Sequence, residues 1–222
     1  MKKIFLSPFF MPITFAVLWA AFDCVAYFGF PDKILEITKE GNLIEDFTHI
    51  GYIFLIGVLL LVANDYKDKM MTWGMYLFLA MCAMLREFGI QHHLSTTDTT
   101  PFKSRFFLNP NNPWSEKVVF GLMLIIVAAS VIYLAVQYAK PLIRNFFKFD
   151  TITWSVAVLC TMGVVTKYID RFPSNWRKAH GGVPLSENVY EIFQLVEESG
   201  EMFLPFIAMI ILYQYHLLFG QK

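Results

Sequence analysis

The sequence predicts an all-α integral membrane protein, a bundle of six transmembrane helices. Two observations lead to this prediction. Of the 222 residues, 56% are hydrophobic and only 16% are charged, whereas soluble domains usually carry about a quarter charged residues. The apolar residues also gather in runs of about 20, the length that a helix needs to cross a bilayer. Short polar connectors separate the runs, without a repeat, so we expect residues 1–222 to form one membrane-embedded domain with no soluble domain.

The six expected spans differ in length, and the last is the longest. They cover residues 9–30, 45–63, 71–91, 117–138, 151–169 and a stretch within 187–219. The N-terminus superficially resembles a signal peptide, but no small-x-small cleavage site follows its apolar run, so we expect a retained first span. Cys24, Cys82 and Cys160 all fall inside apolar runs, which predicts small buried side chains rather than disulfides.

The basic residues of the connectors predict the orientation. Lys2 and Lys3 open the chain, and Lys140, Arg144 and Lys148 lie in the connector before the fifth span. Because cytoplasmic loops of membrane proteins are enriched in Lys and Arg, we expect a bacterial inner (cytoplasmic) membrane protein with both termini in the cytoplasm. The net charge is zero, which gives no indication of nucleic-acid binding.

Ionisable residues gather at one end of each predicted span. They close the odd-numbered spans and open the even-numbered ones, so six crossings place all of them on the same side of the membrane, the periplasmic side in our orientation. The set comprises Asp23, Glu45, Asp46, His49, Arg86, Glu87, His92, His93, Glu116, Lys117, Lys167, Asp170, Arg171, Glu191, Glu197, Glu198 and Glu201. We therefore expect a polar cavity that opens to one side.

Helical spacing and depth sharpen this expectation. Residues four apart share a helix face, which pairs Glu45 with His49 and Glu197 with Glu201. Arg86 comes about 15 residues into its span, or some 22 Å at about 1.5 Å per residue. A charge at that depth needs a partner inside the protein. Candidate partners are Asp170 or a glutamate of the last span for Arg86, and Arg171 or Lys167 for Glu87.

Carboxylates and imidazoles that converge from several helices can bind a divalent metal ion. We expect zinc or iron as the cofactor, if a metal is bound. The expected ligands are Glu45, His49, Glu87, His92, Glu197 and Glu201. The Glu-x-x-His signature of soluble di-iron bundles is missing, so this pattern is generic. A metal ion with an open position activates water, and we expect Glu198, Arg86 and Asp170 to be the catalytic residues.

A site at the membrane boundary predicts a lipid or lipid-linked substrate. Arg171 is expected to bind a substrate anion, and Lys103 and Arg105 stand among aromatic residues in the loop before the fourth span, a composition suited to an interfacial phosphate. The leading hypothesis is thus a metal-dependent membrane enzyme, with membrane lipids as partners and a homo-oligomer or a partner subunit left open.

Three other functions fit the same residues. The charged residues can be structural ion pairs in a non-enzymatic membrane subunit or scaffold. They can form part of a proton or cation pathway, although the opposite half of every span is apolar. His49 with His92 or His93 can also ligate a b-type haem, although the surrounding carboxylates make an unusual haem pocket.

Overall fold

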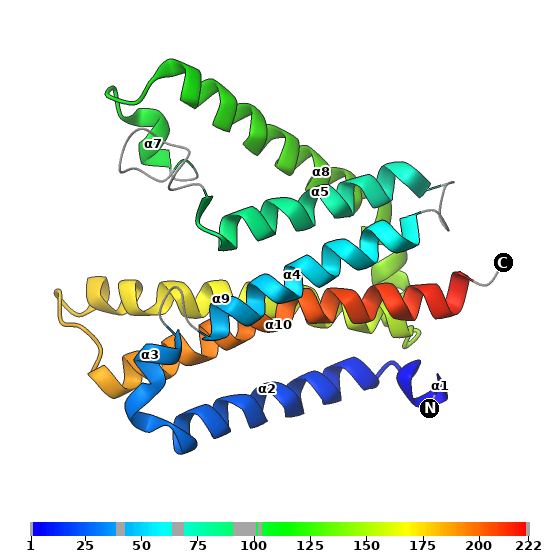
Figure 1. Ribbon diagram of the computed structural model, residues 1–222, viewed down its shortest axis with the longest axis horizontal. Coiled ribbons are helices and arrows are strands. Elements are labelled where there is room, and N and C mark those ends of the chain that lie inside the picture. Colours follow the sequence, from blue (N-terminus) through cyan, green and yellow to red (C-terminus); the bar gives the residue numbers. More distant parts are fainter. Residues whose placement is uncertain (1, 39–42, 64–68, 91–100, 102–103, 221–222) are drawn as a thin grey trace. The chain divides into compact units, whose positions relative to one another are not determined.

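The computed structural model describes residues 2–38, 43–63, 69–90, 101 and 104–220 (Figure 1), and these residues contain helices but no strands. The helices are α1 (Lys2–Phe5), α2 (Phe10–Gly29), the 3-10 turn η1 (Pro31–Lys33), α3 (Ile34–Thr38), α4 (Leu43–Val62), α5 (Met70–Glu87), α7 (Ser104–Leu108), α8 (Trp114–Phe146), α9 (Thr151–Ala179) and α10 (Glu187–Phe219). The predicted all-α class is confirmed for this part of the chain.

Five of the described helices are long and apolar enough to cross a membrane, which indicates a membrane protein. They are α2, α4, α8, α9 and α10. The third expected span is present as α5, but this helix has only 18 residues and ends in Arg86 and Glu87. These charges shorten its apolar stretch, so the sixth crossing stays a prediction.

Contacts divide the chain into two compact units. Unit 1 comprises Met1–Leu55 and Asn145–Lys222, and unit 2 comprises Ile56–Arg144. The division falls inside α4, so one continuous helix belongs to both units. The single domain expected from the sequence stays a prediction, and each unit is described by itself.

In unit 1, α9 and α10 run antiparallel, and α10 also contacts α2 and α3 (Figure 1). Two clusters of buried apolar side chains hold these helices together. The first contains Ala26, Ile34, Ile44, Leu195 and Met202, and the second contains Met11, Phe15, Met162 and Ile207. Because lipid is as apolar as these side chains, close packing rather than hydrophobic burial alone stabilises such contacts within a membrane.

Two glycines allow backbones to approach closely. A Cβ built on Gly51 of α4 would lie 2.7 Å from Cγ of Pro205 in α10. A Cβ built on Gly200 of α10 would lie 2.7 Å from Cγ2 of Thr166 in α9. Only glycine therefore fits at these crossings without a shift of a neighbouring side chain.

The N-terminal segment is fastened to the far ends of α9 and α10 by polar side chains. The Gln214 amide nitrogen donates to the Phe5 carbonyl oxygen at 3.0 Å, and its oxygen accepts from the Ser155 hydroxyl at 2.7 Å. Thr151 donates from its hydroxyl to the Leu6 carbonyl. The side chain of Gln214 is fully buried, so these hydrogen bonds satisfy a polar group that would otherwise destabilise an apolar interior.

Unit 2 contains a short structured segment before α8. The Asn112 side chain is buried and donates to the Phe106 carbonyl oxygen at 2.8 Å. Lys117 donates from Nζ to the Asn109 carbonyl oxygen, also at 2.8 Å. Phe106 is fully buried and packs edge-on against Phe120 of α8. The polar loop thus folds back onto the first turns of α8.

All three cysteines are free thiols, as the sequence indicated, but the prediction that they are buried is wrong for two of them. Cys24 and Cys160 are exposed, and Cys82 is half-buried. A small apolar side chain on the outside of a membrane helix faces lipid, so an apolar run does not distinguish a core position from a lipid-facing one.

Candidate functional site

Lys167 and Glu201 mark the point where α9 and α10 change from uncharged to charged sequence. Residues 151–166 of α9 and 202–219 of α10 contain no Asp, Glu, Lys or Arg. The two helices are antiparallel, so the charged ends lie together, and Lys167 Nζ lies 2.7 Å from Glu201 Oε1. At about 1.5 Å per residue the two stretches span about 24 and 27 Å, somewhat less than a hydrocarbon core of roughly 30 Å. This ion pair therefore lies where the membrane boundary is expected.

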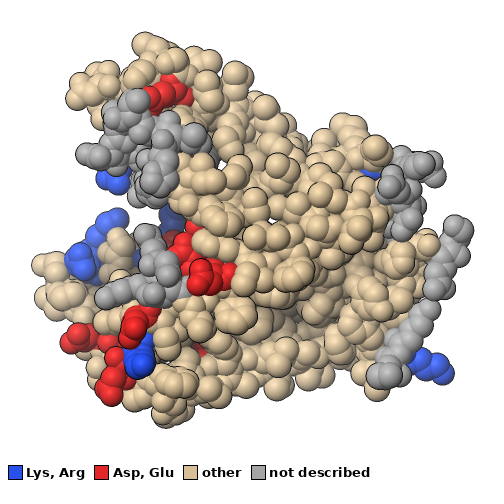
Figure 2. Space-filling model, in the orientation of Figure 1, with Lys and Arg blue, Asp and Glu red and all other residues tan. Residues whose placement is uncertain are grey.

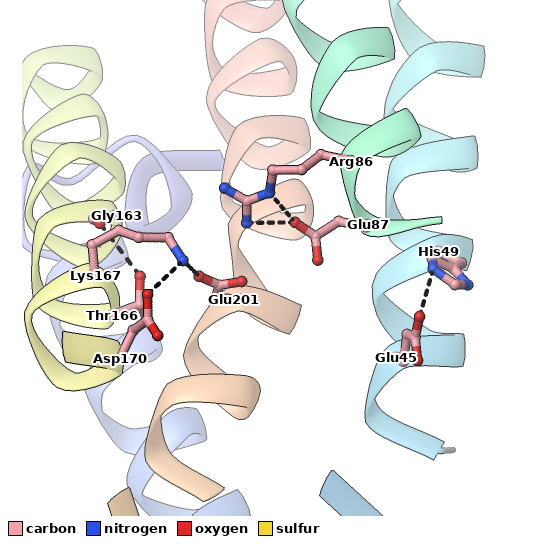
Figure 3. Close-up of polar contacts among 9 residues, drawn as sticks. All are labelled: Glu45, His49, Arg86, Glu87, Gly163, Thr166, Lys167, Asp170 and Glu201. Carbon is pink, nitrogen blue, oxygen red and sulfur yellow. Dashed lines mark hydrogen bonds and ion pairs between the residues drawn. The ribbon is translucent and has the colours of Figure 1, made fainter. Parts of the chain in front are cut away.

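A second carboxylate shares the Lys167 ammonium. Asp170 Oδ2 lies 3.6 Å from Lys167 Nζ (Figure 3). The Glu201 side chain is only 12% exposed, whereas the side chains of Lys167 and Asp170 are each 45% exposed. One partner of Lys167 is thus buried in the bundle and the other faces outward, an arrangement that an incoming polar group can reach.

A buried polar contact joins α2 to α10 beside this cluster. The Trp19 indole nitrogen donates to the Ser199 hydroxyl oxygen at 2.9 Å, and Ser199 is fully buried. Asp23 lies one helical turn from Trp19 on α2. Asp23 is also the first charged residue of α2. The charged end of α2 therefore coincides with those of α9 and α10.

Glu45 and His49 share a face of α4, as their spacing predicts. His49 Nε2 lies 3.5 Å from Glu45 Oε1, and the side chains are 17% and 24% exposed for His49 and Glu45 (Figure 3). Ile44, next to Glu45, packs with Leu195 and Met202 of α10 in the first apolar cluster. The start of α4 thus lies against the half of α10 that carries the glutamates.

Arg86 pairs with its sequence neighbour Glu87. Arg86 Nη2 lies 2.6 Å from Glu87 Oε1, and Nε of the same guanidinium donates to that oxygen at 3.0 Å (Figure 3). Both residues belong to unit 2. The partners that we expected, Asp170 or a glutamate of α10 for Arg86 and Arg171 or Lys167 for Glu87, all belong to unit 1, where Asp170 and Glu201 contact Lys167.

The other predicted site residues are distributed over both units. Glu197 and Glu198 are partly buried in the first half of α10, and Arg171 is exposed on α9. Arg105 is exposed on α7 in unit 2. His92 and Lys103 lie outside the described residues. Within unit 1, Glu45 contacts His49, and Lys167 contacts Asp170 and Glu201. The gathering of the whole set into one site stays a prediction.

The length of α10 explains how it carries so many glutamates. The helix has 33 residues, considerably more than the roughly 20 that cross a bilayer. Its glutamates all lie between Glu187 and Glu201. They precede the uncharged stretch that is expected to cross the membrane. Figure 2 shows Asp and Glu side chains over the end of unit 1 where α3 and the beginning of α10 lie.

The predicted metal ligands do not form a complete site within the described residues. No group of three or more His, Cys, Asp or Glu side chains is close enough there to hold a metal ion. Glu45 with His49 is a two-residue group, and stable zinc sites in proteins use at least three protein ligands. The zinc or iron cofactor stays a prediction that depends on residues outside this part of the chain.

Sequence reasoning missed Trp19 and Ser199, and it did not identify a groove between the ends of α9 and α10. Trp19 stands in an apolar run and Ser199 stands among glutamates, and neither pattern distinguishes a hydrogen-bonded Trp or Ser from an ordinary one. The groove has a volume of about 620 Å³. A signal for it exists in Phe172 and Trp176, which share one face of α9, and in His180, which follows at the same four-residue spacing as the C-cap of that helix.

Comparison of the chain with models of protein families, with curated proteins and with solved structures found no match.

Proposed function

We propose that this protein is a membrane-embedded enzyme that acts on a lipid or lipid-linked substrate at the membrane boundary. One observation carries the proposal: Lys167 contacts a buried carboxylate, Glu201, at 2.7 Å and an exposed one, Asp170, at 3.6 Å, at the end of two uncharged helical stretches. An ion pair at this level is reached from the headgroup region, and intramembrane ionisable residues usually have a function.

The proposed roles follow from exposure and charge. Asp170 is outward-facing and can exchange a proton with water or substrate, as can Glu198 on the neighbouring helix, and general acid–base catalysis uses carboxylates in this way. Arg171 follows Asp170 directly and can bind a substrate phosphate or carboxylate. Arg86 keeps its predicted catalytic role, and Lys103 and Arg105 keep their predicted roles in binding the substrate.

No catalytic step is assigned to a metal ion, because no three His, Cys, Asp or Glu side chains of the described residues lie close enough to bind one.

We further propose that the chain crosses the membrane six times, with α5 as the additional span. We also propose a bacterial inner membrane and cytoplasmic termini. The support is the basic residues expected on the cytoplasmic side, which are Lys2, Lys3, Lys140, Arg144 and Lys148.

A second candidate is a non-enzymatic subunit in which the charges fix the helix packing. The observation that favours it is the neutralisation of Lys167 by carboxylates of two helices, since a satisfied ion pair between helices can specify packing without any ligand. Glu45 with His49 fits the same description.

Reconstitution into vesicles of bacterial polar lipids separates the two candidates. Lipid composition is followed by mass spectrometry with wild type, Glu198→Gln, Asp170→Asn and the control Asp46→Asn, which changes an exposed carboxylate at the start of α4. The enzyme hypothesis expects turnover of a lipid by wild type and control, and a loss of at least tenfold in the other two variants with unchanged thermal unfolding. Wild type without turnover, together with destabilised variants, would support the structural candidate.

A further inference from the structure

The Lys167 ammonium is held in place by a carboxylate of the neighbouring helix. Glu201 Oε1 lies 2.7 Å from Nζ, and the Glu201 side chain is only 12% exposed. Each partner directly follows a residue of a close contact between the two helices. A Cβ built on Gly200 would lie 2.7 Å from Cγ2 of Thr166. The ion pair therefore sits beside a tight crossing of α9 and α10, which fixes the position of the ammonium.

A more exposed carboxylate is the second partner of this ammonium. Asp170 Oδ2 lies 3.6 Å from Lys167 Nζ, a longer contact than that of Glu201 (Figure 3). The side chains of Lys167 and Asp170 are each 45% exposed. An incoming oxygen atom can therefore replace Asp170 beside the ammonium, while Glu201 keeps the ammonium in position. Asp170 then lies next to the bound group, where it can accept a proton.

The ion pair lies at the level expected for the ester groups of membrane lipids. Lys167 and Glu201 are the first charged residues beyond the uncharged stretches of α9 and α10. Because these stretches span about 24 and 27 Å and the hydrocarbon core roughly 30 Å, the pair falls at the edge of the hydrocarbon. The fatty-acyl chains of a phospholipid are joined to glycerol at this edge. Its phosphate lies farther out, on the other side of the glycerol.

Arg171 is suitably placed for that phosphate. It follows Lys167 by four residues, so it shares a face of α9 with Lys167 and lies about 6 Å farther along the helix. Arg171 is exposed, and no carboxylate among the described residues lies within 4 Å of its guanidinium. Guanidinium groups bind phosphate well. One cation at the ester level and a second farther out match the order of the ester and the phosphate in a glycerophospholipid.

We propose that the protein hydrolyses an acyl ester of a glycerophospholipid and that Lys167 binds the ester carbonyl oxygen. Under the proposed function, on which this inference rests, the protein is thus a lipid ester hydrolase. Water attacks the carbonyl carbon and gives a proton to Asp170, while the electron pair of the carbonyl bond moves to the oxygen beside Lys167. A fixed cation at that oxygen stabilises the negative charge that develops there.

The second half of the reaction breaks the ester. The electron pair returns from the oxyanion, the bond between the acyl carbon and the glycerol oxygen breaks, and Asp170 gives its proton to the glycerol oxygen. The products are a fatty acid and a lysophospholipid. Lys167 is a catalytic residue in this scheme, and Glu201 is a positioning residue that acts through Lys167.

The test reconstitutes the full chain into vesicles of bacterial polar lipids, to which the dialkyl ether analogues of phosphatidylethanolamine and phosphatidylglycerol are added. Mass spectrometry is expected to show lysophospholipid and fatty acid in equal amounts, with both ether analogues intact. Wild type alone supplies this result, so it does not depend on the folding of a variant.

Three variants test the residues. Lys167→Met should lower kcat by about a hundredfold or more, because removing one oxyanion-binding group costs about 10²–10³ in kcat. Glu201→Gln keeps an acceptor for the ammonium but not the charge, so it should lower kcat less and leave KM unchanged. Lys178→Met, at another exposed lysine of α9, is the control and should keep the wild-type rate. Rates are compared below the unfolding temperature of each variant.

The results that overturn the inference differ from those that overturn the enzyme hypothesis. Release of the headgroup, or cleavage of the ether analogues at the rate of the diacyl lipids, would contradict ester hydrolysis and leave the enzyme hypothesis standing. Lys167→Met with the wild-type rate would contradict the role of Lys167. Wild type that turns over no lipid would contradict both the inference and the enzyme hypothesis.

Discussion

Lys167 and Glu201 are the first charged residues beyond the uncharged stretches of α9 and α10, and their side chains meet at 2.7 Å. This ion pair relates the sequence of the two helices to their expected position in the membrane. Each residue alone ends an apolar run, but their pairing shows that the two runs end at the same level in unit 1. The charged part of α2 is linked to the same part of α10 by Trp19, one turn from Asp23, whose indole nitrogen donates to the Ser199 hydroxyl oxygen at 2.9 Å.

Removing the ammonium of Lys167 is expected to destabilise unit 1. Lys167→Met keeps the length of the side chain and leaves the Glu201 carboxylate, which is 12% exposed, without this partner. Removing the charged partner of a mostly buried carboxylate should lower the free energy of unfolding by about 1–3 kcal/mol. Asp170→Asn, at a side chain 45% exposed, should change stability by well under 1 kcal/mol because exposed ion pairs contribute little. Thermal unfolding in mild detergent measures both, and equal effects of the two variants would contradict the argument.

Gly200 is expected to tolerate no side chain. In Gly200→Ala the new Cβ would lie 2.7 Å from Thr166 Cγ2, and overpacking a close contact costs about 1–3 kcal/mol. Gly163→Ala is the matched control: no atom of the described residues lies within 4 Å of a Cβ built there, and alanine stabilises a helix interior by about 0.5–1 kcal/mol relative to glycine. The free energies of unfolding of the two variants should therefore change in opposite directions. A stable Gly200→Ala variant would show that α9 and α10 are less tightly packed than described.

The hydrogen bond between Trp19 and Ser199 is expected to couple α2 to α10. Trp19→Phe and Ser199→Ala each remove it, and a double-mutant cycle isolates its energy. Hydrogen bonds between membrane helices average about 0.6 kcal/mol and reach about 1.7 kcal/mol. Because Ser199 is fully buried, we expect a value toward the upper end of that range. A coupling energy near zero would mean that the contact contributes only packing.

The all-α class and five membrane-length helices could be predicted from composition and run length, because a bilayer demands long uncharged helices. The i, i+4 pair of Glu45 and His49 was also predictable, because helix geometry alone brings such side chains together. The contact of Arg86 with its neighbour Glu87 was not expected, because the depth of a charge in a span shows only that it needs a partner. The predicted partners of Arg86 in unit 1 stay a prediction. The close approach at Gly200 likewise depends on tertiary packing, which no local pattern encodes.

The metal hypothesis makes a prediction about His49. If Glu45 and His49 hold zinc or iron together with a ligand from outside the described residues, protein purified without chelators contains one equivalent of that metal. His49→Ala should then lose it, while Asp46→Asn retains it. Elemental analysis and an absorption spectrum decide the matter, and a Soret band would instead make the histidine a haem ligand. Equal metal content in both variants would place any metal away from His49.

The docking of the N-terminal segment is expected to depend on Gln214. Its amide donates to the Phe5 carbonyl oxygen at 3.0 Å and its oxygen accepts from Ser155 at 2.7 Å. Gln214→Leu has a similar volume but leaves both groups without this partner, which should lower the free energy of unfolding by about 1–3 kcal/mol. It should also speed proteolytic cleavage within residues 2–9, because segments that lose their hydrogen bonds open more often. Gln137→Leu, the same change at an exposed position of α8, is the control and should alter neither. Cleavage of Gln214→Leu at the wild-type rate would show that aromatic contacts such as Phe5 with Tyr213 hold this segment by themselves.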